Sequence, residues 1–157
     1  WQETYRVGST KLVKMINPEL KRKIGRLQDY TQALSGYVTM DQKKLLDNKE
    51  KLAAMERWFL LSVDEAIDIN STFIYQIGGQ IAESYKSTFH ELVPLKVIGL
   101  ELAEKIAESA KIRNQLTHDY EKLQKKDAIE AIKKFYPLYK EYLTILIGKF
   151  VKPILTI

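Results

Sequence analysis

A chain of 157 residues, 45% hydrophobic and 29% charged, is long enough for one domain with a proper core. Its two histidines and its lack of cysteine exclude disulfides and thiolate or histidine-rich metal sites, and cysteine-free composition fits the cytoplasm. The net charge of +5 suits a nucleic-acid partner without requiring one. The sequence contains no apolar run of roughly twenty residues, so no membrane-spanning helix is predicted.

The N-terminal region divides into two parts. Residues 1–16 have no clear apolar register, so an N-terminal arm or a short helix is expected, followed by a single helical domain over 17–157. Asn17-Pro18-Glu19 has the features of a helix start, because asparagine caps, proline suits the first helical position and glutamate favours the positive end of the dipole. Apolar residues at three- and four-residue spacing then predict a helix over about 18–35.

The middle of the chain contains the longest helical pattern. Residues 39–46 predict a short helical turn, and Asp47 with Glu50 has the spacing of a capping box. A wide apolar surface then continues to Gly78-Gly79, which predicts a long helix buried on more than one side. A second short helix is expected over 84–93.

The C-terminal half predicts two more long helices. One follows Gly99 and continues to about residue 119. The other begins at a second capping-box pattern, Asp127 with Glu130, contains Pro137 and ends before Pro153. Its aromatic stripe lies at helical spacing and is expected to pack in the core rather than stack on bases. Together these elements predict an all-α fold, an antiparallel four-helix bundle with short additional helices.

One stretch holds the residue types that phosphodiester chemistry needs: Arg113-Asn114, then His118, then Tyr120. Asn114 and His118 lie one turn apart on one helix face, and Arg113 lies on the neighbouring stripe. In RNA cleavage, His118 would act as base or acid, Arg113 would clamp the scissile phosphate, and Asn114 would hydrogen-bond to either group. This chemistry needs no metal and no cofactor. The same pattern also suits a plain helix terminus.

Arg113-Asn114, His118 and Tyr120 together resemble the R-x4-H-x-Y signature of the HEPN superfamily, specifically its HepT-like toxins. The likeness covers about residues 20–150 and includes three further segments: Glu56-Arg57, Glu65 to Ile69, and Glu83 to Lys86 with Phe89. The resemblance implies an HEPN-like bundle with ribonuclease activity, and a homodimer whose motifs face a shared cleft. A two-fold axis would bring a second His118 to that cleft and supply both an acid and a base.

The resemblance also implies a protein partner. HepT-like proteins belong to HEPN/MNT toxin–antitoxin modules, in which the MNT antitoxin, a nucleotidyltransferase, silences the toxin by attaching adenylate to the motif tyrosine. That position is Tyr120 here. Asp68 matches an acidic position of the family's second helix and is expected to orient Arg113, although a solvated or salt-bridged face would also account for it.

Three possible functions stay open at this point. The first is a ribonuclease toxin with RNA as substrate, and the second is a non-catalytic helical partner, or substrate-binding subunit, of a small nucleotidyltransferase. A basic RNA-binding bundle is a third. The intact Arg113, His118 and Tyr120 favour the ribonuclease.

Overall fold

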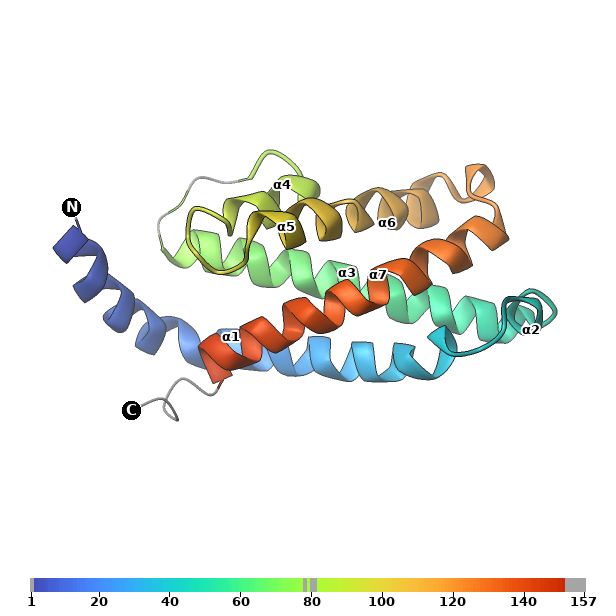
Figure 1. The fold of residues 1–157 in the computed structure, drawn as a ribbon, viewed down its shortest axis with the longest axis horizontal. Coiled ribbons are helices and arrows are strands. Elements are labelled where there is room, and N and C mark those ends of the chain that lie inside the picture. Colours follow the sequence, from blue (N-terminus) through green and yellow to red (C-terminus); the bar gives the residue numbers. More distant parts are fainter. Residues whose placement is uncertain (1, 78, 80–81, 152–157) are drawn as a thin grey trace.

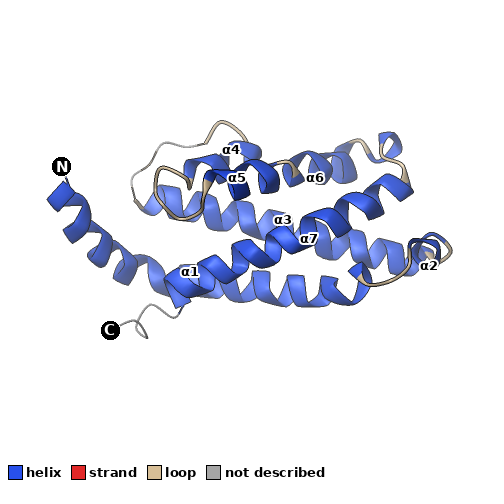
Figure 2. Cartoon of the chain, viewed as in Figure 1, coloured by secondary structure: helices blue, strands red, loops and turns tan. Residues whose placement is uncertain are grey.

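The computed structural model describes residues 2–77, 79 and 82–151, with side chains from residue 18 onward. Every regular element of this part of the chain is helical (Figure 2), so the all-α prediction is confirmed. The elements are α1 (Gln2–Val38), α2 (Gln42–Leu46), α3 (Lys49–Gln76), α4 (Tyr85–Glu91), α5 (Leu100–Ala107), α6 (Ser109–His118), the 3₁₀ turn η1 (Tyr120–Lys122), α7 (Lys125–Leu146) and the π-helical turn η2 (Ile147–Val151).

Four long rods form the bundle: α1, α3, the pair α5–α6, and α7 (Figure 1). The first and third rods run in one direction along the bundle, and α3 and α7 run in the opposite direction. The short α4 packs against α3, α5 and α6, and α2 caps the far end where α1 turns into α3. The predicted antiparallel four-helix bundle with short additional helices is therefore confirmed.

The first helix is longer than its sequence pattern predicted. It begins at Gln2 and passes through Pro18, so the prediction that a helix starts at Pro18 was wrong. A proline inside a helix removes one backbone hydrogen bond and bends the helix, but its fixed φ is compatible with helical geometry. In Figure 1 the N-terminal part of α1 curves away beyond the end of the bundle.

Two other predicted helix starts shift by a few residues, and one predicted helix is divided in two. The cap of α3 is Asn48, whose side chain accepts from the Lys51 backbone N–H at 3.1 Å, rather than Asp47. Helix α7 begins at Lys125, so Asp127 lies inside its first turn, where a carboxylate suits the dipole. The single helix predicted over about 100–119 is interrupted at Glu108, where α5 ends and α6 begins.

Other boundaries agree with prediction. The short helix α2 falls within the predicted turn, and α4 begins at a capping box between Ser84 and Ser87. Helix α3 ends at Gln76, just before the Gly78-Gly79 pair. Gly78 itself and Pro153, predicted to end the last helix, lie outside the described residues.

A set of hydrogen-bonded polar side chains, here called the buried tyrosine seam, links α7 to α3, α4 and α6. The Tyr142 hydroxyl donates to Asn70 Oδ1 at 2.5 Å, and Asn70 Nδ2 donates to the Thr88 hydroxyl at 3.1 Å. The Tyr139 hydroxyl lies 2.7 Å from that of Ser109. All five side chains are buried, so the predicted core role of the α7 aromatics is confirmed. Burial raises the pKa of both tyrosines.

Candidate active site

The candidate site is built where α6 packs antiparallel against α3. Two contacts define their register: Arg113 pairs with Asp64, and seven residues later Tyr120 approaches Glu56, eight residues earlier on α3. At about 1.5 Å of rise per residue, both intervals span roughly 10–12 Å. The two contacts therefore fit two segments that run alongside each other. Helix α3 therefore supplies an acidic partner for each end of the motif.

Three neighbours hold the Arg113 side chain. Its Nε donates to Asp64 Oδ1 at 2.7 Å, and its Nη1 donates to Asn114 Oδ1 at 3.2 Å. Its guanidinium carbon lies 5.2 Å from the centroid of the Tyr85 ring, at the range of a cation–π contact. The side chain keeps 16% of its surface exposed, and Nη2 makes no hydrogen bond to the described residues. The guanidinium is thus positioned in advance, with donors left for an anion.

The acid that contacts Arg113 is Asp64, and the expected contact from Asp68 does not form. Asp68 lies one turn further along α3 and pairs with Lys23 of α1. The rotation between the two positions turns Asp68 toward α1, while Asp64 stays turned toward α6. The resemblance thus indicated the correct helix, but the acid that contacts Arg113 lies one turn from the expected position.

Three of the motif side chains line an open groove of about 950 Å³ between α6 and the start of α4. Arg113, Asn114 and His118 contribute to one wall, and the start of α4 contributes Tyr85 and Lys86. His118 is the last residue of α6 and is exposed, so its imidazole can reach a ligand in the groove. The structure therefore brings the predicted arginine, asparagine and histidine to one surface.

Tyr120 lies outside that groove, in the turn η1. The residue is 52% exposed, and its hydroxyl is 3.5 Å from Oε2 of the buried Glu56, a long hydrogen bond. Burial raises the pKa of Glu56, and the contacts with Tyr120 and Lys125 partly oppose that shift. The Glu56 charge and then burial raise the pKa of Tyr120. Tyr120 is thus half exposed to solvent, while its hydroxyl faces a carboxyl group.

Sequence reasoning did not single out Glu56 or Tyr85 as site residues. Both fall in segments that carry the family resemblance, which was the available signal. Their place at the site depends on how α3 and α4 dock on α6, and periodicity within one helix does not report that docking.

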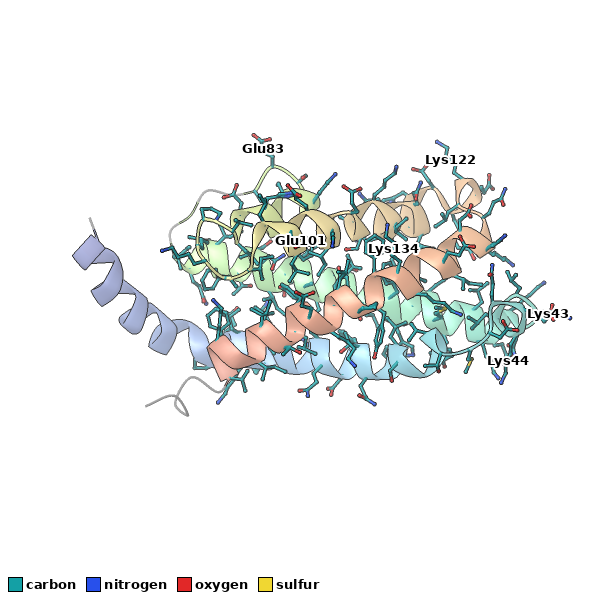
Figure 3. The ribbon with its side chains drawn as sticks, viewed as in Figure 1. Lys43, Lys44, Glu83, Glu101, Lys122 and Lys134 are labelled. Atoms are coloured by element: carbon teal, nitrogen blue, oxygen red, sulfur yellow. The ribbon has the colours of Figure 1, made fainter. Side chains whose placement is uncertain are left out.

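Several lysine side chains lie at the end of the bundle at which the motif finishes. Figure 3 shows Lys122 projecting from the turn after α6, and Lys43 and Lys44 projecting from α2 at the same end. Lys125 and Lys126, at the start of α7, are also exposed. Among the residues whose side chains are described, no group of three or more metal-ligating side chains occurs.

Comparisons with known proteins identify the class. Residues 21–146 match the HepT-like family, described as ribonuclease HepT-like. A protein named tRNA nuclease HepT from Aphanizomenon flos-aquae is 29% identical over 119 residues, which cover 74% of this chain and 79% of that protein. The chain therefore belongs to the HepT-like family of ribonucleases, in the HEPN superfamily, and the predicted family and enzyme class are confirmed.

Two solved structures show the same fold. A tri-AMPylated HEPN toxin of Shewanella oneidensis, determined in complex with its MNT antitoxin, has a TM-score of 0.73 at 16% identity and covers 83% of this chain and 97% of that one. YutE, a cytosolic protein of Bacillus subtilis, has a TM-score of 0.73 at 13% identity, covering 88% and 93%. Within the described part of this chain, none of the helices has the length and apolar character needed to cross a membrane.

Proposed function

We propose that this chain is a metal-independent endoribonuclease toxin of a HEPN/MNT toxin–antitoxin module in the cytoplasm. Its active site is the groove that contains Arg113, Asn114 and His118. The observation that carries this proposal is the fixed Arg113 guanidinium, held by Asp64 and Tyr85 beside an exposed His118 in the same groove. These are a phosphate clamp and a proton-transfer group at one surface.

The reaction follows from the RNA itself. A base removes the proton of the ribose 2′-hydroxyl, the oxygen attacks the adjacent phosphorus, and the 5′-oxygen leaves with a proton from an acid, which yields a 2′,3′-cyclic phosphate. Arg113 stabilises the charge that accumulates on the phosphoryl oxygens, and Asn114 holds Arg113 in place. Because the nucleophile belongs to the substrate, no metal is needed to generate it.

One histidine cannot readily serve as base and acid in the same step. We therefore propose a two-fold homodimer in which His118 of each protomer faces a shared cleft, so that one copy takes a proton and the other gives one. Light scattering at micromolar protein concentration is expected to give the mass of a dimer. A monomer that cleaves RNA at full rate would remove the second histidine from the mechanism.

The partner nucleotidyltransferase is proposed to silence the toxin at Tyr120. The phenol oxygen would attack the α-phosphorus of ATP, pyrophosphate would leave, and the phenol proton would pass to a nearby base. The attached adenylate would add bulk and negative charge two residues from His118, within reach of Lys125 and Lys126. RNA phosphates would then be repelled from the groove.

Intact-mass measurement tests this silencing. Co-expression with a cognate nucleotidyltransferase is expected to add one or more adenylate masses, and Tyr120→Phe is expected to abolish the addition. If the Tyr120→Phe protein gains the same mass, another residue is modified. If the parent protein gains none but loses activity in the complex, inhibition occurs by binding alone.

The ribonuclease itself is tested by RNA cleavage in a metal chelator. The parent protein is expected to stay active, and Arg113→Ala is expected to lower turnover by about 10²–10³, the usual cost of losing a preorganised charge at the transition state. Arg22→Ala, an exposed arginine on α1, is the matched control. Equal rates for Arg113→Ala and Arg22→Ala would refute the site. No cleavage by the parent would favour a non-catalytic partner of the nucleotidyltransferase.

A further inference from the structure

Tyr85 is the aromatic side chain of the candidate groove. It is the first residue of α4, lines the groove together with Arg113 and His118, and remains 50% exposed. Tyr139 and Tyr142 of α7, in contrast, have at most 1% of their surface exposed. The Tyr85 ring is therefore accessible to a ligand bound in the groove.

The backbone of Tyr85 is fixed by the core. The Thr88 hydroxyl donates to the Tyr85 carbonyl at 2.8 Å, and the same hydroxyl accepts from buried Asn70, which accepts in turn from Tyr142. A reciprocal capping box between Ser84 and Ser87 also fixes the turn in which Tyr85 lies. An exposed ring on an immobilised backbone loses little conformational entropy when a ligand covers it.

The Tyr85 ring is also held by its contact with Arg113. The Arg113 guanidinium lies 5.2 Å from its centroid, so one side of the ring faces the cation while half of the residue's surface stays open to solvent. The group proposed to hold the scissile phosphate and the open aromatic surface are therefore direct neighbours. In a nucleotide, the phosphate and the base are likewise neighbours, joined through one ribose.

We infer that Tyr85 is a stacking platform for the nucleobase that adjoins the scissile phosphate, and that this base is unpaired when it binds. Stacking needs a base whose flat face is free, and the bases of a duplex cover one another. The platform should accept any of the four bases, because each has an aromatic face. This inference rests on the proposed ribonuclease function and adds the part of the substrate that the site reads.

The first test measures binding without cleavage. In a His118→Ala background, an RNA carrying 2-aminopurine next to the mapped cleavage position should lose fluorescence on binding, because the fluorescent base stacks on the ring. The quench should disappear with Tyr85→Leu and return with Tyr85→Phe, which restores the ring. Tyr136→Leu is the matched control, since the Tyr136 ring also has a cation nearby, Lys140 at 5.8 Å, but lies on α7 outside the groove.

The second test separates stacking from the positioning of Arg113. Tyr85→Leu should raise KM by about 10- to 100-fold, the range expected for losing one base–aromatic stack. An RNA with an abasic ribose next to the cleavage position should show the same rise with the parent protein. Tyr85→Leu should then show no further loss on the abasic RNA, because the two changes remove the same contact.

Two results would overturn the inference while leaving the ribonuclease intact. One is an unchanged 2-aminopurine quench in the Tyr85→Leu background. The other is full additivity of Tyr85→Leu and the abasic ribose, which would mean that the ring acts only on Arg113. Loss of the proposed function would look different, since the parent protein would then fail to cleave RNA at all.

Discussion

The buried tyrosine seam and the motif groove are both polar, and they differ in where their polar groups find partners. In the seam, the hydroxyls of Tyr139 and Tyr142 pair with other protein atoms, away from water. In the groove, Arg113 is held by protein on one side, while Asn114 and His118 face solvent. Polar groups that are satisfied internally stabilise the fold, and those held in place but left open are available to a ligand.

The largest stability effect is expected in the seam. Tyr142→Phe removes the donor to Asn70 Oδ1 and leaves that buried acceptor without its partner, at a cost of about 1–3 kcal/mol. Denaturant unfolding should show this loss of stability. Tyr75→Phe, at a residue that is 81% exposed, is the control and should stay within about 0.5 kcal/mol of the parent protein. Equal stabilities for the two variants would contradict the role given to the seam.

A smaller effect, on cleavage rather than stability, is expected at Asp64. Asp64→Ala removes the carboxylate that orients Arg113 and should lower kcat by about tenfold, which corresponds to roughly 1.4 kcal/mol of transition-state stabilisation. Since Asp64 is 47% exposed, stability should change little. Asp68→Ala, which breaks only the contact with Lys23, should leave kcat near that of the parent. A larger loss from Asp68→Ala than from Asp64→Ala would reverse the assignment.

The smallest effect concerns Glu56, a buried residue of α3 that contacts Tyr120. Burial raises its pKa above the ordinary 4.5, so the folded state binds the proton more tightly than the unfolded chain does. The folded state therefore loses stability as the pH rises from the ordinary pKa of Glu56 through its raised pKa in the folded protein. The stability stays lower at neutral pH. Glu56→Gln should raise Tm at pH 7, on the order of 1 °C because Tyr120 and Lys125 offset part of the burial cost, and should change nothing below about pH 4. A destabilised variant at pH 7 would show that the carboxylate is favourably paired.

Much of the fold could be predicted because helical periodicity and capping are local. The bounds of α2 and the capped start of α4 follow from residues within one turn of each other. Pro18 was misinterpreted because proline is compatible with both the first turn and a bent interior, and tertiary packing decides between them. The interruption at Glu108 was missed because no glycine or proline marks it.

The site was predictable to the extent that it lies on one helix. Arg113, Asn114 and His118 share the groove because their spacing on α6 already places them on adjoining faces. Contacts between helices could not be derived, since the rotation of α3 about its axis decides whether Asp64 or Asp68 meets Arg113. The same reason hides Glu56 and Tyr85, which enter the site through the packing of α3 and α4.

The measurement that tests the central claim most directly compares RNA cleavage and thermal unfolding of His118→Ala with those of the parent protein. If the groove is the active site, cleavage should fall by about 10²–10⁴, the range for losing a general acid or base, and Tm should stay the same because the side chain is exposed. A His118→Ala protein with the parent's Tm and the parent's cleavage rate would place the chemistry elsewhere in the molecule.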